Sequence, residues 1–378
     1  MLKKHIAQDS GNDQAAQASN FATRLLQWFD AHGRKDLPWQ QNINAYRVWV
    51  SEIMLQQTQV ATVIPYYRRF MQSFPTVAAL AAAADDVVLH HWSGLGYYSR
   101  ARNLHAAAKI IAADLEGKLP GDLESWQALP GIGRSTAAAI CSISFESTDA
   151  ILDGNVKRVL ARHFAVPGWP GHASVSKKLW QLAELCTPSQ RNRDYSQAIM
   201  DLGATLCVRS KPRCQDCPLA TSCEAKKQGN VADFPGRKPK RTIPVRATRL
   251  LMLENSSGEL LLLKRPPAGI WGGLWSLPEH ETFAENLPLH KPVEWPTLRH
   301  TFTHFHLDIT PVHCVLNEHR DMAAKCAALQ GSRETTQTLW YDIDNPPDIG
   351  LPAPISKLLA QVSNARHSSN ADDQEVGT

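Results

Sequence analysis

The sequence predicts a mainly helical N-terminal part, followed by a C-terminal domain that mixes helices and strands. Over residues 20–225, apolar residues recur at helical spacing, and no alternating strand pattern of any length appears. From about residue 246 the pattern changes to short alternating runs, two of which flank the turn signal Asn255–Gly258. The chain has 378 residues, 43% of them hydrophobic and 20% charged, which is typical of a folded protein with at least two domains.

Shifts in composition divide the chain into five segments: a disordered polar tail (1–18), a helical domain (19–225), a basic linker (226–245), an α+β domain (246–361) and a second disordered polar tail (362–378). Residues 226–249 contain eight Lys or Arg against one acid, Asp233. This stretch is either a solvated tether or a tether that also contacts phosphates. With no apolar run that could span a membrane and no secretory signal, we expect a cytoplasmic protein.

Local signals place the helices of the first domain. Thr76 is expected to cap a helix that continues to His90, because apolar residues follow it at helical spacing. Prolines are expected to separate the helical segments, and they occur at positions 65, 75, 120, 130, 167 and 188.

The segment Leu129–Ala137 is a glycine-punctuated turn that opens a helix. Gly131 and Gly133 allow the backbone to turn sharply and to approach a ligand closely. The helix begins with unpaired N–H groups and the positive end of its dipole, which suit a phosphate. Asp153 follows shortly afterwards, and an anion near such an anchor is costly unless it stabilises a cation. The two features together indicate an enzyme that acts on a nucleotide in DNA.

Glu52 is a candidate general acid. It lies among apolar neighbours such as Trp49 and Ile53, where a carboxyl group keeps its proton to a higher pH. A glutamate on a solvated helix face is an equally weighted alternative. Asp153, at a helix N-terminus and beside Asn155, is instead expected to stay ionised.

Four of the eight cysteines fall within one short loop: Cys207, Cys214, Cys217 and Cys223. Clustered thiolates in a reducing compartment indicate a metal site. Zinc and an iron–sulfur cluster are both compatible with this spacing. A single loop with only one C-x2-C pair favours a 4Fe-4S cluster, at odds of about two to one.

A second glycine turn, Gly94–Tyr98, carries two tyrosines and precedes two arginines. An aromatic side chain at such a turn can wedge between stacked bases, whereas the alternative places both rings in the core. We expect one tyrosine in the core and the other exposed.

Together these segments resemble the helix–hairpin–helix DNA glycosylases of the endonuclease III superfamily, and most closely the branch that removes adenine. The motifs are Leu-Pro-Trp (37–39), Ser-Glu-Ile-Met-Leu-Gln-Gln-Thr-Gln (51–59), Gly-Leu-Gly-Tyr-Tyr-Ser-Arg-Ala (94–101), Leu-Pro-Gly-Ile-Gly-Arg-Ser-Thr-Ala (129–137), Leu-Asp-Gly-Asn-Val-Lys-Arg-Val (152–159) and the cysteine loop. The resemblance implies a six-helix barrel that holds the hairpin, and a second lobe with a 4Fe-4S cluster on the loop 207–223. It also implies a monomer that binds double-stranded DNA between the lobes.

The resemblance assigns roles residue by residue. It implies that Glu52 protonates N7 of a flipped adenine, while Asp153, with Asn155 beside it, stabilises the sugar cation. It implies DNA contacts for six further residues: Gln57, Tyr97, Gly131, Gly133, Ser135 and Gln197. Bifunctional members carry a lysine where this chain has Ser135, and serine cannot form an imine, so we expect a monofunctional glycosylase that uses water.

The C-terminal part resembles the Nudix-like domain that ends this family. No acidic box follows Trp271–Pro278, so this domain is expected to bind without hydrolysing. The resemblance implies that the turn Phe302-Thr303-His304 recognises 8-oxoguanine, although Thr303 replaces the serine of the family and His304 has an ordinary strand histidine as its alternative. The expected substrate is DNA in which adenine is mispaired with 8-oxoguanine or guanine.

The sequence opposes three other functions. Ser135 opposes a glycosylase–lyase that acts on oxidised pyrimidines, and so does the additional C-terminal domain. The presence of both Glu52 and Asp153 opposes a non-enzymatic protein that only binds damaged DNA. The missing acidic box opposes a Nudix pyrophosphatase.

Overall fold

The computed structural model describes residues 18–239, 242–280, 292–315 and 337–375. The chain forms two compact units. The first holds residues up to Ala82 together with Asn103–Lys240, and the second holds Ala83–Arg102 together with the chain from Arg241 onward. Among the described helices, none is both long and apolar enough to cross a membrane.

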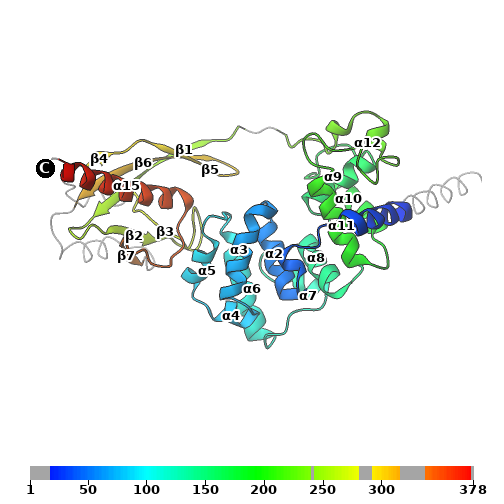
Figure 1. The fold of residues 1–378 in the computed structure, drawn as a ribbon, viewed down its shortest axis with the longest axis horizontal. Coiled ribbons are helices and arrows are strands. Elements are labelled where there is room, and N and C mark those ends of the chain that lie inside the picture. The colour runs from blue at the N-terminus through cyan, green and yellow to red at the C-terminus, as the bar shows by residue number, and fades with distance from the viewer. Residues whose placement is uncertain (1–17, 240–241, 281–291, 316–336, 376–378) are drawn as a thin grey trace, which may run out of the picture. The chain divides into compact units, whose positions relative to one another are not determined.

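The first unit is built of helices (Figure 1). They are a helix over residues 18–32, η1 (Pro38–Gln40), α2 (Ala45–Leu55), α3 (Val60–Ser73), α4 (Val77–Ala82), the end of α6 (Ser99–Asp114), α7 (Leu123–Gln127), α8 (Arg134–Phe145), α9 (Gly154–His163), α10 (Ala173–Cys186), α11 (Asn192–Thr205), α12 (Glu224–Lys227) and η2 (Val231–Asp233). Short polar side chains begin several of them. The Asn44 side chain accepts a hydrogen bond from the Arg47 N–H at 3.0 Å, and that of Asp122 accepts from Ser125 at 2.9 Å.

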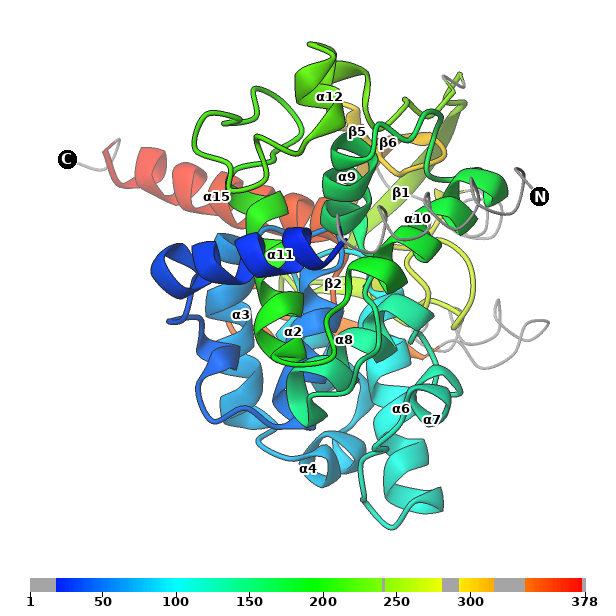
Figure 2. The same ribbon diagram turned by 90° about the vertical axis from the view of Figure 1, so that its right-hand side faces the viewer.

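Two groups of helices make up this unit. Helix α2 packs against α3 and α8, whereas α9 packs against α10, α11 and α12, and α11 also contacts α8. The helix over 18–32 lies beside α11 in Figure 2, and its Phe21 meets the His163 ring with centroids 4.8 Å apart. Trp49 and Trp126, both fully buried, fill the core between α2 and α7. Full burial of a side chain such as Phe21 contributes about 1.5–3 kcal/mol.

Two local expectations need correction. Thr76 does cap a helix, since it accepts a backbone hydrogen bond at 3.1 Å, but that helix ends at Ala82 and α5 (Asp85–Trp92) begins separately. The two acids that open α5 favour a new N-terminus there. Pro65 lies inside α3 rather than between helices, and the burial of Tyr67 and Phe70 offsets the hydrogen bond that it removes.

The second unit contains one sheet. Its strands are β1 (Val245–Glu254), β2 (Leu260–Lys264), β3 (Trp275–Ser276), β4 (Val293–Glu294), β5 (Leu298–Thr301), β6 (His306–Val315) and β7 (Thr338–Tyr341). The order is β3-β2-β1-β6-β4, with β7 on β2 and β5 on β6, and only β1 and β6 pair in parallel among the described strands. The predicted hairpin is confirmed, because the Asn255 side chain accepts from the N–H groups of Ser257 and Glu259.

Helix α15 (Ala353–Glu375) covers one face of this sheet (Figure 1). Its apolar residues, among them Leu358 and Val362, join a core with Met252 and Ile309. The expectation of a disordered tail from residue 362 is therefore wrong as far as residue 375, since helical spacing brings Val362 under Leu358. The N-terminal tail was likewise expected to include residue 18, which lies buried in the first helix. Residues 1–17 lie outside the described residues.

Residues 83–102 pack with the sheet of the second unit, although the sequence assigned them to the helical domain. The Asp86 carboxylate accepts hydrogen bonds from Lys264 Nζ at 2.9 Å and from Trp275 Nε1 at 3.2 Å. The Tyr98 hydroxyl donates to the Leu351 carbonyl at 2.8 Å. Residues 83–102 therefore belong to the second unit, although they precede much of the helical unit in the sequence.

The predicted linker is ordered over its first half. Helix α12 and η2 lie within it or overlap it, and the Gly236 N–H donates to the Gly168 carbonyl at 3.0 Å. The Phe234 carbonyl accepts from Arg162 Nε at 2.9 Å. Residues 226–238 therefore belong to the first unit rather than to a solvated tether.

Candidate active site

Glu52 lies on α2, one turn after the fully buried Trp49. Its side chain is only partly exposed, and no hydrogen-bond donor to its carboxyl group occurs among the described residues. Burial raises the pKa of Glu52 from 4.5 to about 8, and the neighbouring carboxylate of Asp153 adds to the rise. The carboxyl group is thus protonated at neutral pH, which agrees with a proton donor rather than a solvated surface residue.

Asp153 is the N-cap of α9, and its surroundings differ from those of Glu52. Its carboxylate accepts from the Val156 N–H at 2.7 Å and from the Asn155 side-chain amide at 3.4 Å. Burial raises its pKa, while the backbone N–H groups of Val156 and Asn155 and the cations of Arg158 and Lys157 oppose the rise. The net direction is upward, so ionisation is harder than the sequence led us to expect. Within the pair, and in the described part of the chain, Asp153 alone accepts hydrogen bonds from groups that favour its anion.

The glycine turn places a second helix N-terminus in the same unit. Gly131 has φ of +77°, and a Cβ there would lie 2.6 Å from that of Asn103, so the fold itself requires glycine. Gly133 is the N-cap of α8 with φ of −89°, and a Cβ there would meet nothing within 4 Å. No side chain caps α8. The Ser135 hydroxyl instead accepts from the Leu152 N–H at 2.9 Å, which fixes the segment leading into Asp153.

Two arginines one turn apart on α9 hold the cysteine loop. Arg158 donates to the carbonyls of Cys207 and Gly203 at 2.7 and 2.8 Å, and to the Asn155 side chain at 2.8 Å. Arg162 donates to the Cys207 and Val208 carbonyls at 3.3 and 2.7 Å, and approaches the Cys207 Sγ at 3.4 Å. The helix that begins at Asp153 is thereby tied to the start of the loop.

The four loop cysteines are near enough to influence one another. Burial raises the pKa of Cys217 to about 12, and the charges of the other three, Cys207, Cys223 and Cys214, contribute to that rise. All four thiols are free and partly exposed. Within the described part of the chain, no three His, Cys, Asp or Glu side chains surround a single point suited to one metal ion. The donor set itself, four soft thiols from one loop, fits an iron–sulfur cluster.

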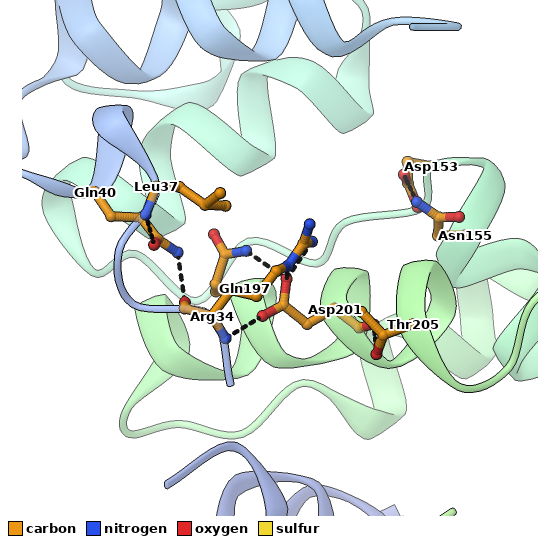
Figure 3. Close-up of polar contacts among 8 residues, drawn as sticks. All are labelled: Arg34, Leu37, Gln40, Asp153, Asn155, Gln197, Asp201 and Thr205. Atoms are coloured by element: carbon orange, nitrogen blue, oxygen red, sulfur yellow. Dashed lines mark hydrogen bonds and ion pairs between the residues drawn. The ribbon is translucent and has the colours of Figure 1, made fainter. Parts of the chain in front are cut away.

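Gln197 lies on α11 with its side chain half-buried. Its amide Nε2 donates to Asp201 Oδ1 at 2.9 Å, and Asp201 also binds Arg34 (Figure 3). Gly203, further along α11, has room for no side chain because the Asn155 Cβ lies 2.6 Å from where its own Cβ would be. The end of α11 therefore lies against the start of α9.

Gln57 and Tyr97 share an unusual backbone. Both have positive φ, +59° and +49°, and both are exposed, Tyr97 by 45%. Left-handed backbone at non-glycine residues costs energy and often marks a functional site. Tyr98 is half-buried, so one tyrosine of the turn is held and the other is exposed, as predicted.

The turn Phe302–Phe305 in the second unit is closed by the Phe302 N–H, which donates to the Phe305 carbonyl at 2.9 Å. Thr303 and His304 are exposed, and Thr303 Oγ1 lies 3.2 Å from His304 Nδ1. The rings of Phe302 and Phe305 stack with centroids 4.5 Å apart. The segment after Pro278, where the sequence lacks an acidic box, extends into residues 281–291, which lie outside the described residues.

Sequence reasoning missed four residues of this region: Arg34, Arg158, Arg162 and Asp201. Two signals were available. Arg158 and Arg162 are four residues apart on a predicted helix and so share a face. Asp201 lies in Ile-Met-Asp-Leu, a carboxyl group among apolar residues, which is the same signal that identified Glu52.

Comparison with protein-family models gives two matches. Residues 50–185 match the model described as the HhH-GPD superfamily base excision DNA repair protein, and residues 249–361 match the NUDIX domain. The predicted fold class is thereby confirmed: a helical glycosylase-type domain precedes a Nudix-like domain.

Known proteins are similar over most of the chain. An adenine DNA glycosylase of Buchnera aphidicola subsp. Schizaphis graminum is 37% identical over 350 residues, which are 90% of this chain and 97% of that protein. The adenine DNA glycosylase of Homo sapiens is 37% identical over 317 residues, covering 70% of this chain and 58% of that protein. Among solved structures, a thermostable thymine-DNA glycosylase superposes with a TM-score of 0.51 and 25% identity, covering 56% of this chain and 98% of that one.

Proposed function

Because the chain belongs to the adenine DNA glycosylases, enzymes of base excision repair, we propose that it hydrolyses the N-glycosidic bond of adenine mispaired with 8-oxoguanine or guanine. It acts as a monomer on double-stranded DNA and takes the adenine out of the base stack. The observation that carries this proposal is the carboxyl pair: Glu52 with a raised pKa, next to Asp153 with donors that favour its anion.

The two carboxyl groups divide the reaction between them. Glu52 donates its proton to adenine N7, so that the base leaves neutral when the C1′–N9 bond breaks and its electron pair moves to the base. Asp153 stabilises the oxocarbenium-like sugar, and Asn155 keeps its carboxylate oriented at 3.4 Å. A water oxygen then bonds to C1′ and loses its proton to a carboxylate. The arrangement resembles that of glycoside hydrolysis, where two carboxyls in different surroundings take different roles.

In this proposal, residues that are exposed or that have a left-handed backbone contact the DNA. The uncapped N-terminus of α8 and the open space at Gly133 suit a phosphate, with Ser135 in the first turn of that helix. Gln57 and Tyr97, with their left-handed backbone, enter or fill the stack. Gln197 contacts the extruded base.

The enzyme is monofunctional in this proposal. Serine at position 135 cannot form an imine with the sugar, and its hydroxyl is already engaged with the Leu152 N–H. Strand cleavage therefore requires alkali or another enzyme.

Cys207, Cys214, Cys217 and Cys223 hold a 4Fe-4S cluster in this proposal. When bound, the cluster cross-links the loop 207–223. Arg158 and Arg162 hold the loop carbonyls in place from α9. None of the steps at the glycosidic bond passes through the cluster.

The Nudix-like domain recognises 8-oxoguanine opposite the adenine in this proposal. Phe302 sets the turn, while Thr303 and His304 are exposed and carry the polar groups that contact the lesion. A Thr303→Ala, His304→Ala double variant should lose the preference for an 8-oxoguanine partner over guanine. Preserved discrimination would refute this assignment.

A single-turnover assay on a duplex with adenine opposite 8-oxoguanine tests the proposal. Strand breaks should appear only after alkali, because the enzyme leaves an abasic site. Asp153→Asn should reduce adenine release by several orders of magnitude, whereas a loss below about tenfold, roughly 1.4 kcal/mol, would remove Asp153 from the mechanism. Breaks without alkali would indicate a lyase, and no base release would leave a protein that only binds.

A further inference from the structure

The turn Gly94–Tyr98 has its backbone fixed on both sides of Tyr97. Before Tyr97, the Gly96 carbonyl accepts from Trp92 Nε1 at 3.2 Å and from Arg100 Nη2 at 3.0 Å. After it, the Tyr97 carbonyl accepts from the Arg100 N–H at 2.9 Å. Because a carbonyl oxygen has two lone pairs, these bonds use the full capacity of the Gly96 carbonyl. Both peptide units that flank Tyr97 are therefore held, and with them its left-handed φ of +49°.

The side chains that hold this turn are buried, whereas the Tyr97 ring is not. Trp92 is fully buried and Arg100 is 8% exposed, while Tyr97 is 45% exposed. The Arg100 guanidinium lies 5.4 Å from the centre of the Trp92 ring and 5.5 Å from that of the Tyr97 ring. The turn thus presents one aromatic ring outward from a buried support.

Tyr98 ties the turn to the C-terminal part of the chain. Its hydroxyl donates to the Leu351 carbonyl at 2.8 Å and accepts from the Gly94 N–H at 3.4 Å. One oxygen atom thereby joins the first residue of the turn to residue 351. The neighbouring Gly350 carbonyl accepts from the Trp275 N–H at 2.9 Å, so the tie continues into strand β3.

Arg102 provides a second tie. Its Nη1 donates to the Gly272 carbonyl at 2.6 Å, and its Cδ lies 3.5 Å from where a Cβ on Gly273 would be. The Gly273 N–H donates to the Pro266 carbonyl at 3.0 Å, which closes the loop that leads into β3. All of these residues belong to the second unit. The unit that carries the turn Phe302–Phe305 therefore also holds the turn that carries Tyr97.

We propose that Tyr98 is a positioning residue, whose hydroxyl fastens the turn Gly94–Tyr98 to the Nudix-like domain and so places the Tyr97 ring for insertion between stacked bases. This inference rests on the proposed function, in which Tyr97 enters the stack. It gives the domain a second task. Thr303 and His304 respond to the base opposite the adenine, whereas Tyr98 acts on the inserted ring whichever base lies there. The two tasks therefore affect the release rates differently.

The experiment measures single-turnover adenine release, at saturating enzyme, from two duplexes with 8-oxoguanine or guanine opposite the adenine. Tyr98→Phe keeps the ring and removes only the hydroxyl, so the packing of the ring is retained. Release should fall by about fivefold on both duplexes, the loss expected for one hydrogen bond. The ratio of the two rates should stay within about twofold of wild type. The Thr303→Ala, His304→Ala double variant should instead change that ratio.

A fluorescent base reports insertion of the ring separately from base release. The emission of 2-aminopurine placed beside the mispair rises when its neighbours are unstacked. With all the DNA bound, Tyr98→Phe should reduce that rise, which a loss of protein stability alone would not change. Tyr97→Ala should abolish the rise, and Tyr98→Phe added to Tyr97→Ala should lower the release rate no further.

Tyr341→Phe is the matched control. It removes a tyrosine hydroxyl from the same unit, and that hydroxyl makes no hydrogen bond within the described part of the chain. Its release rates and fluorescence should equal those of wild type. Arg102→Met cuts the second tie, at Gly272, and should reproduce the effect of Tyr98→Phe.

Several outcomes would overturn the inference. Unchanged release and fluorescence in Tyr98→Phe would mean that the tie does not place the ring. A loss confined to the 8-oxoguanine duplex would mean that Tyr98 acts through recognition of the lesion. Full additivity with Tyr97→Ala would mean that the hydroxyl acts on another part of the enzyme. Failure of the proposed function is distinguishable, because wild type would then release adenine from neither duplex.

Discussion

The raised pKa of Glu52 sets the pH dependence of adenine release. At a pKa of about 8, about 90% of the Glu52 side chains keep their proton at pH 7, against about 0.3% at the ordinary value of 4.5, a difference of about 300-fold in the acid form. Glu52 therefore loses its proton as pH rises through about 8, rather than through 4.5. The second-order rate of release should therefore decline about tenfold between pH 7 and pH 9.

The assay is single-turnover release from the adenine:8-oxoguanine duplex at enzyme concentrations below the dissociation constant, from pH 5 to pH 9.5. DNA binding, measured separately at each pH, separates the loss of the acid from the loss of the complex. Glu52→Gln serves as the control, since its amide cannot donate a titrating proton and its residual rate should show no decline near pH 8. A wild-type rate that is level from pH 7 to pH 9, or that already falls with rising pH near pH 5, would refute this account of Glu52.

Three further outcomes are expected. Glu52→Gln should raise the free energy of unfolding at pH 7 by up to about 3 kcal/mol, because a carboxyl with a raised pKa destabilises the folded state as pH rises from 4.5 toward 8. Denaturant titrations of wild type and variant at pH 5 and pH 8 check this. Equal stabilities of the two proteins at pH 8 would contradict it. Gly131→Ala should lower the free energy of unfolding by about 1 kcal/mol or more, because its backbone is left-handed and a Cβ would collide with Asn103. Gly133→Ala should lower it by at most about 1 kcal/mol but should weaken DNA binding. Thermal melts and binding titrations check both, with Gly121→Ala, at an equally open position, as the control. Cys217→Ser should lower bound iron and acid-labile sulfide in purified protein, and stoichiometric zinc without sulfide in wild type would contradict the cluster.

The carboxyl pair was predictable because each member carries a local signal. Apolar neighbours surround Glu52 in the sequence, and Asp153 precedes a helix that it then caps. The upward shift in the pKa of Asp153 was not predictable, because it depends on burial by elements distant in the chain. Helix propensity and capping act over a few residues, whereas burial is a property of the folded whole.

Long-range contacts also account for what was missed. Arg34 meets Asp201 across 167 positions of sequence, and no local pattern pairs them. The polar composition after residue 361 predicts a disordered tail, but helix α15 continues there and packs on the sheet through apolar residues such as Val362. In the same way, no local sequence pattern around Asp86 predicts its hydrogen bonds with Lys264 and Trp275.

That last contact changes where the chain can be cut. A fragment that starts in the basic segment near residue 240 would lack Leu89, which is buried and lies against Gly350. It would also leave the ammonium of Lys264 without the carboxylate of Asp86. Such a fragment would expose the apolar surface that Leu89 covers and would tend to self-associate when produced alone. Shuffling this half of the protein between relatives would therefore succeed only if Ala83–Arg102 moved with it.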